Sequence, residues 1–130
     1  MIKEINIKTN KKQEIVDITS KVSEIVRDVK EGNVLVYVPH ATAAVIINEN
    51  YDPNICDDLL EALDKIIPSE CWRHDKVDNN GAAHIKAAIL GPSENVIVKD
   101  GKLMLGTWQS LMLVDLDGPR NRKVFVKVLS

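Results

Sequence analysis

Three histidines lie in three separate polar segments of this sequence, and imidazoles are the side chains that most readily bind metals or transfer protons near neutral pH. His40 follows Pro39 after an apolar run, His74 lies in a polar stretch, and His84 follows a row of small residues. Together with the carboxylate of Asp78, they could hold a divalent metal, Zn²⁺ or Mg²⁺, with one position left open. Their spacing matches no recognised ligand motif, so the metal site is a hypothesis.

The segment 78–86 combines residues that commonly begin helices with small residues, Gly81 to Ala83, whose side chains do not shield the backbone N–H groups. Asp and Asn commonly cap helices, so we expect a helix to begin at Gly81. The free N–H groups of its first turn could bind an anion such as a phosphate group. The alternative is a capped helix whose small residues only allow close packing.

The segment around His40 places polar groups where a buried strand is expected to end. Rigid elements present such groups to ligands, so Thr42, and Asn48 further along the chain, could contact a substrate. Glu49 could act as a general acid or base. In the alternative interpretation, His40 is a loop histidine bonded to a nearby carbonyl group.

A third polar segment contains the sequences GTWQ and DGPR. Arg120 and Arg122 lie at a turn, where their planar guanidinium groups could grip a phosphate or carboxylate. Asp115 is the other candidate acid or base, while Gln109 would orient a substrate and Thr107 would contact it. An ordinary turn with solvated arginines is the alternative.

The elements that must position these residues follow from apolar periodicity, which predicts an α+β fold of mainly antiparallel, packed sheets with two to three helices. Strands are predicted over Ile2–Lys8, Gln13–Ile18, Asn33–Val38, Ala44–Glu49, Asn95–Lys99, Leu103–Leu116 and Lys123–Leu129. Helices are predicted from Thr19 to about Lys30, from Asp52-Pro53 to Pro68, and over Gly81–Leu90. We expect the first two strands to pair across residues 10–12, and the strand 33–38, apolar on both faces, to be covered on both.

Composition indicates one globular domain covering residues 1–130, with 45% hydrophobic and 28% charged residues. A net charge of −2 argues against a general nucleic-acid or membrane-surface binder, so we expect neither partner. No apolar run reaches the roughly 20 residues that span a bilayer. Cys56 and Cys71 form no disulfide framework, and buried or half-buried free thiols fit a reducing compartment, so we expect a cytoplasmic protein.

Taken together, these segments resemble the YjbQ family, known as secondary thiamine-phosphate synthase enzymes, nearly from end to end. The matching stretches are His40–Ala44 with Ile47–Glu49, Asp78-Asn79 with Ala83–Ala87, and Leu105–Gln109 followed by Asp117–Arg120. The GTWQ and DGPR elements are specific at this spacing. Ala41 stands where the family often has a hydroxyl residue, and Asp115 where it usually has Glu, a change that would shift or weaken activity if that Glu is catalytic.

The resemblance implies packed sheets assembled as a homotrimer, with a metal-binding site near subunit boundaries. It also implies a weak thiamine-phosphate synthase activity, which joins hydroxymethylpyrimidine diphosphate to a thiazole phosphate. The working hypothesis is therefore a metal-assisted transferase, with three groups of residues: metal ligands His40, His74, His84 and Asp78; substrate contacts Thr42, Asn48, Gly81, Thr107, Arg120 and Arg122; and catalytic residues Glu49, Asp115 and Gln109. A zinc-dependent hydrolase of phosphate or amide bonds, and a binding module for phosphorylated small molecules without catalysis, are the alternatives.

Overall fold

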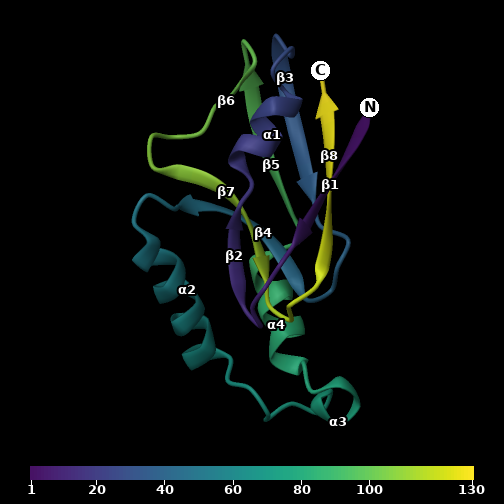
Figure 1. Ribbon diagram of the computed structural model, residues 1–130, viewed down its shortest axis with the longest axis vertical. Helices are drawn as coiled ribbons and strands as arrows, with labels where there is room; N and C mark the ends of the chain where they lie inside the picture. Colours follow the sequence, from purple (N-terminus) through teal and green to yellow (C-terminus); the bar gives the residue numbers. More distant parts are fainter.

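Alternating apolar side chains build two antiparallel β-sheets, which pack against each other in the computed structural model of residues 1–130 (Figure 1). The larger sheet has the order β1-β8-β3-β5-β6 and the smaller one the order β2-β7-β4. The strands are β1 (Ile2–Lys8), β2 (Glu14–Asp17), β3 (Glu31–Tyr37), β4 (Ala43–Glu49), β5 (Ser93–Lys99), β6 (Lys102–Leu103), β7 (Gln109–Asp115) and β8 (Asn121–Leu129). The helices are α1 (Thr19–Ile25), α2 (Pro53–Ile66), α3 (Asp75–Asp78) and α4 (Gly81–Leu90). The predicted α+β class is confirmed, and the short α3 adds a fourth helix to the two or three that were predicted.

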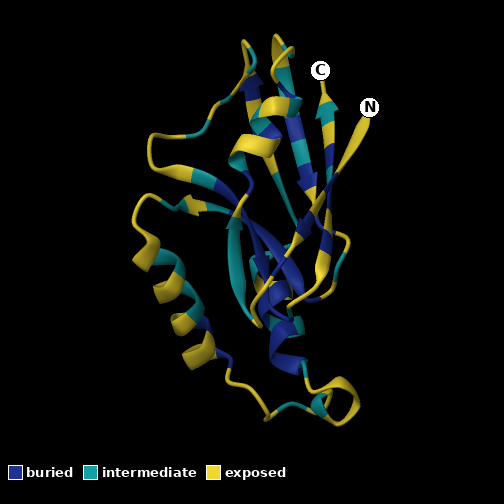
Figure 2. Cartoon of the chain, in the orientation of Figure 1, coloured by how far each residue is buried: buried dark blue, intermediate teal, exposed yellow.

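The core lies between the two sheets, because successive strand side chains point to opposite faces and one face of each strand is apolar. Val34 and Val36 of β3 are fully buried there, opposite Leu111 and Leu113 of β7. A second apolar cluster fills the other face of the small sheet, where α2 and α4 cover it. Figure 2 shows this buried centre, with exposed residues at the tips and on the outside of α2. The small sheet is thus covered on both faces.

The larger sheet is covered on one face only, so the prediction that strand 33–38 is buried on both sides is wrong. Leu35 is half-buried and Tyr37 is 43% exposed, although both lie on a central strand. Ile2 and Phe125 lie beside them and line the same shallow apolar hollow. The second apolar face of β3 is therefore not covered by another layer of the same chain. It forms part of an uncovered apolar strip, which consists of Ile2, Leu35, Tyr37 and Phe125.

β2 does not pair with β1, contrary to the expected hairpin. β2 joins β7 in the small sheet, with Glu14 opposite Asp115, while β1 pairs with β8. β7 is buried on both faces, and pairing with β2 and β4 satisfies the backbone groups along both of its edges. Residues 9–13 consequently cross from one sheet to the other.

Helix α1 ends at Ile25, earlier than the predicted end near Lys30. The carbonyl groups of Val29 and Lys30 accept hydrogen bonds from the backbone of Gly101 and Asp100, which draws the chain into β3. Gly101 has φ +74°, and a Cβ there would lie 2.2 Å from a backbone oxygen of Arg27, so only glycine fits. None of the four helices combines the length and apolar character needed to cross a membrane.

Candidate functional site

His84 lies in the first turn and a half of α4, at the junction of two solvent-open hollows. One, of about 320 Å³, is shared with His40 and is lined mostly by small residues. The other, of about 710 Å³, is shared with His74 and with Trp72 and Arg73. His74 and His84 meet edge to face, with ring centroids 4.7 Å apart. Three sequence segments thus bring their imidazoles to one end of the molecule, which we call the histidine end (His40, His74 and His84).

A metal centre is not completed within the chain, since no three His, Cys, Asp or Glu side chains are placed to hold an ion. Nε2 of His40 accepts a hydrogen bond of 2.9 Å from the backbone N–H of Lys123, so this nitrogen is already occupied. Asp78 lies 3.8 Å from Nε2 of His74, and both side chains are largely exposed. The four predicted ligands, His40, His74, His84 and Asp78, therefore do not fit a metal within one chain.

His40 is held as a neutral imidazole at the start of β8. Burial lowers its pKa, and the charges of Arg122 and Lys123 lower it further, against the opposing effect of Asp115. A nitrogen that accepts a backbone hydrogen bond must be unprotonated, which agrees with this direction. His40 is thus bonded to a backbone N–H group, in place of the carbonyl considered from the sequence.

Asp115 and Arg122 form a buried ion pair beneath the histidine end. The carboxylate is fully buried and the guanidinium 3% exposed, and their atoms lie 2.6 Å apart. Thr9 donates to Asp115 at 2.6 Å, and Arg122 donates to the hydroxyl of Thr42 at 2.9 Å. Burial alone would raise the pKa of Asp115, but the hydrogen bonds from Arg122 and Thr9 outweigh it and lower the pKa. The expected acid or base Asp115, and the expected substrate contacts Thr42 and Arg122, are instead enclosed in the core.

Asp117 ties the DGPR turn to the start of α4. Its carboxylate accepts from Lys12 at 2.5 Å, from Asn80 at 3.0 Å and from Arg120 at 3.1 Å. Burial opposes ionisation, but these hydrogen bonds lower the pKa of Asp117 to about 2. Arg120 keeps 54% of its side chain exposed, so its remaining N–H groups face solvent.

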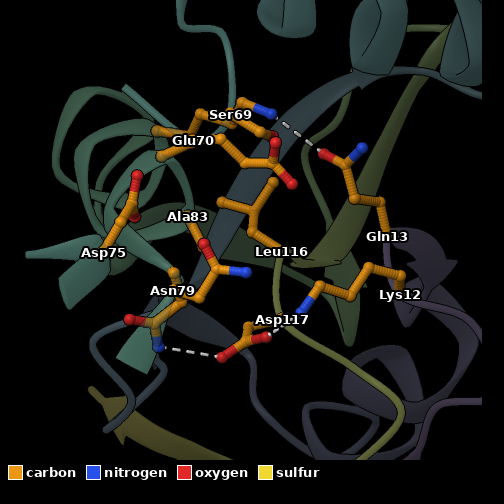
Figure 3. Close-up of a pocket in the computed structure, with 12 residues that line it drawn as sticks. Lys12, Gln13, Ser69, Glu70, Asp75, Asn79, Ala83, Leu116 and Asp117 are labelled. Atoms are coloured by element: carbon orange, nitrogen blue, oxygen red, sulfur yellow. Dashed lines mark hydrogen bonds and ion pairs between the residues drawn. The ribbon is translucent and has the colours of Figure 1, made fainter. Parts of the chain in front are cut away.

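The predicted anion site at the start of α4 is already filled by the protein. The N–H group of Gly81 donates to the carboxylate of Asp75 at 2.8 Å. A Cβ on Gly81 would lie 2.8 Å from Cβ of Trp72, so glycine permits this close approach. In Figure 3 Asp75 and Lys12 lie on opposite sides of a small polar hollow of about 80 Å³ beside this helix start. Lys86 also lines it and is buried in an ion pair with Asp64.

The other predicted site residues lie at the opposite end of the small sheet. Glu49 of β4 stands across from Gln109 of β7, whereas Ala43 stands across from Asp115. Six residue steps at about 3.4 Å each separate these pairs, a distance of roughly 20 Å. Asn48 and Thr107 lie beside Glu49 and Gln109 at this end of the sheet. One chain therefore does not bring its histidines and its candidate residues Asn48, Glu49, Thr107 and Gln109 into a single site.

Two exposed aromatic rings mark this second end. Tyr51 and Trp108 pack edge to face with centroids 5.0 Å apart, and they remain 78% and 58% exposed. We call this feature the aromatic tip (Tyr51 and Trp108). Sequence reasoning did not identify Tyr51, and it did not identify Arg73 or Lys123 at the histidine end. No local signal could have found them, because their significance depends on contacts between distant segments.

Comparisons with known proteins place the chain in a family. The family described as "UPF0047 protein YjbQ-like" matches residues 3–130. A UPF0047 protein of Archaeoglobus fulgidus is 46% identical over 127 residues, covering 97% of this chain and 99% of that protein. The UPF0047 protein YugU of Bacillus subtilis is 40% identical over 134 residues, covering 99% of each.

Solved structures agree with these relatives. A YbjQ-like protein of unknown function from Sulfolobus solfataricus superposes with a TM-score of 0.95 at 38% identity, covering 100% of this chain and 96% of the other. A YjbQ/UPF0047 protein from Clostridium acetobutylicum gives a TM-score of 0.92 at 43% identity, covering 97% and 98%. On sequence and fold alike, this chain belongs to the YjbQ/UPF0047 family.

Proposed function

We propose that this chain binds a phosphorylated small molecule at His84 and joins it to a second molecule, as in the union of hydroxymethylpyrimidine diphosphate with a thiazole phosphate. The supporting observation is the position of His84, which lines both hollows of the histidine end and contacts the ring of His74. A side chain at such a junction can touch both halves of a two-part substrate, and an imidazole can donate a proton to a departing diphosphate.

Positive charge around the histidine end supports an anionic ligand. Arg122 is paired with Asp115 in the core, so it does not reach solvent. Lys123 and Arg120 remain exposed near His40, where their charges lower the pKa of that imidazole. Arg73 lines the larger hollow beside His74. These cations would bind the phosphate groups and offset the charge of a departing diphosphate.

Metal assistance has no place within one chain, because three ligands are not gathered there. For the same reason a zinc-dependent hydrolase is not favoured, since such enzymes hold zinc through three protein ligands. In the proposed reaction, the ring nitrogen of the thiazole phosphate bonds to the methylene carbon of the pyrimidine as the bond from that carbon to the diphosphate breaks. His84 donates a proton to the departing diphosphate, while neutral His40 shapes the adjoining hollow.

Binding without catalysis is a second candidate, and the location of the carboxylates favours it. Of the two expected acid or base residues, Asp115 is buried in an ion pair and Glu49 lies roughly 20 Å from the histidine end. A chain acting alone would then recognise a phosphorylated molecule without a carboxylate to activate it. Turnover separates the two candidates, since both predict binding.

The test measures binding of inorganic pyrophosphate by calorimetry to the wild type, to His84→Ala and to Lys99→Ala. Lys99 is an exposed residue at the far end of β5 and serves as the matched control. We expect His84→Ala to weaken binding about tenfold or more, and Lys99→Ala to leave it unchanged. Equal binding by all three proteins would refute the proposal.

Catalysis is tested by mixing the two phosphorylated halves with chelator-treated protein, and again after Mg²⁺ or Zn²⁺ is added. Product formed by the wild type above the level of His84→Ala supports the transferase. Tight pyrophosphate binding with no product under any condition would leave the binding module as the function.

We also propose that the chain assembles as a homotrimer, which the family resemblance implies. The apolar strip on the outer face of the large sheet, which includes Tyr37 and Phe125, supports self-association, because soluble chains seldom leave such strips uncovered. Light scattering should give a mass three times that of the 14.5 kDa chain. A monomer at all concentrations would contradict this.

A further inference from the structure

We propose that Asp75 is a positioning residue, which holds His74 against His84 and so keeps the larger hollow of the histidine end in the shape that binds a ligand. Asp75 itself does not line that hollow. Its importance for binding rests on the function proposed above, whereas its effect on the two imidazoles can be measured without any ligand.

The carboxylate of Asp75 joins both ends of the segment that carries His74. One oxygen accepts a hydrogen bond of 2.8 Å from the N–H group of Gly81, and the other accepts one of 3.0 Å from the N–H group of Trp72. Hydrogen bonds to a carboxylate are stronger than those between neutral groups. A single side chain therefore closes the loop that runs from Trp72 to Gly81.

The closed loop brings the two imidazoles together. A Cβ on Gly81 would lie 2.8 Å from Cβ of Trp72, so the two backbone segments approach as closely as glycine allows. His74 lies two residues after Trp72, and His84 lies nearly one helical turn after Gly81. Their rings then meet edge to face, with centroids 4.7 Å apart. The contact between the rings thus depends on the contact between the two backbone segments.

The segment that Asp75 closes adds little to the core of the fold. None of the residues 68–80 belongs to either apolar cluster, and no residue of α3 is buried. In Figure 1, α3 stands clear of both sheets, beyond the start of α4. Glu70 and Asn79 have φ values of +65° and +54°, which residues other than glycine seldom adopt. Backbone strain of this kind gathers at functional sites, and this segment supplies one wall of the larger hollow.

Charge and position predict opposite results when Asp75 is removed. Asp75→Ala deletes a negative charge close to a site that is proposed to bind phosphate groups, so charge alone would tighten the binding. If Asp75 instead holds His74 and His84 together, its loss lets the loop open and weakens the binding in spite of that charge effect. The direction of the change therefore separates the two roles.

Calorimetry with inorganic pyrophosphate measures that direction. We expect Asp75→Ala to weaken binding about tenfold or more. Asp75→Asn removes the same charge but keeps one oxygen as an acceptor, because its amide nitrogen only donates, so its affinity should lie between those of the wild type and Asp75→Ala. Asp58→Ala removes the same side chain from an exposed position on α2 and is the matched control, which should bind like the wild type.

Proton NMR of the imidazoles gives a readout that needs no ligand. The chain has three histidines, and an aromatic ring shifts the resonances of protons that it meets edge to face. In Asp75→Ala the ring resonances of His74 and His84 should move towards those of free histidine. Those of His40 should stay in place, because its imidazole is bonded to the N–H group of Lys123. Circular dichroism should show the strand content of the wild type.

Unchanged or tighter pyrophosphate binding by folded Asp75→Ala, or unshifted resonances of His74 and His84, would overturn the proposal. Tighter binding would mean that Asp75 acts only through its charge. Equal binding by Asp75→Ala and the wild type that still depends on His84 would leave the proposed function standing. If the wild type binds no pyrophosphate, that function is removed, and the resonances alone decide whether Asp75 positions the two rings.

Discussion

The two ends of the small sheet contain similar polar residues in opposite environments. Asp115 and Arg122 at one end are enclosed, paired and hydrogen bonded, whereas Glu49 and Gln109 at the other end lie near solvent with few protein partners. Asp115 and Gln109 lie at opposite ends of one strand, β7, while Glu49 lies on β4 and Arg122 on the neighbouring β8. Residue type therefore does not tell which polar side chains in this protein support the fold and which are free to bind a ligand. Their burial and their pairing do.

The largest expected effect comes from breaking the enclosed pair. Asp115→Ala would leave the guanidinium of Arg122 buried without its partner, and Nε of Arg122 already lacks one in the chain. The free energy of unfolding should fall by about 3–5 kcal/mol, as for other broken buried pairs. Urea denaturation measures this. The double variant Asp115→Leu, Arg122→Met should lose less, and an equal or greater loss would contradict the account.

The second largest effect should be a loss of stability in acid, caused by protonation of Asp117 beside the enclosed pair. The pKa of Asp117 is lowered to about 2 in the folded protein, so its ion pairs stabilise the fold above pH about 4 and lose this effect as the pH falls through about 2. The contribution is about 2 kcal/mol. Thermal unfolding between pH 5 and 2 should show a steeper loss in the wild type than in Asp117→Asn. Parallel curves would show that Asp117 does not carry this dependence.

A smaller effect is expected at His40, which lies between the buried network and solvent. Removing its imidazole leaves the N–H group of Lys123 without its acceptor, so His40→Ala should cost about 0.5–1.5 kcal/mol. His74→Ala is the matched control, because the exposed side chain of His74 makes no hydrogen bond and its loss should cost less. Equal losses in urea would mean that the hydrogen bond to Lys123 is not what stabilises the segment.

The smallest effect is expected at the open end. Glu49→Gln and Gln109→Ala should change the free energy of unfolding of dissociated chains by less than about 0.5 kcal/mol, since surface substitutions rarely do more. The measurement is made at low protein concentration, so that assembly does not contribute. If either variant lost as much free energy of unfolding as Asp115→Ala, the exposed end would be as important for the fold as the enclosed end, and the comparison would be wrong.

The sequence predicted correctly those elements whose first and last residues are marked by capping residues, proline or glycine. Asp52 before Pro53 predicted the start of α2, and in the structure its side chain accepts from the N–H of Asn54 at 3.0 Å. Strand β1 has the predicted bounds, and α4 begins and ends where Gly81 and Gly91 indicated. Signals of this kind act within a few residues, so a single sequence contains them.

Features that depend on distant contacts could not be predicted in this way. The pairing of β2 depends on the edge of β7, and the residues after α1 are held by the distant turn at Asp100 and Gly101. At the site, the sequence indicated three histidine segments, and these do meet at one end of the molecule. It could not show that Asp115 and Arg122 are each other's partners, because a carboxylate and a guanidinium look the same in a sequence whether they are buried or free.

The carboxylate of Asp75 accepts a hydrogen bond from the N–H group of Gly81, and so competes with any free anion for the start of α4. A covalently attached group competes at an effective concentration of about millimolar or more, without diffusing away. A free anion must exceed that threshold to replace it, so dilute monovalent anions leave the helix start closed. Only a ligand held by additional contacts elsewhere would open it, and displacing Asp75 would also release Trp72, whose backbone N–H donates to the same carboxylate.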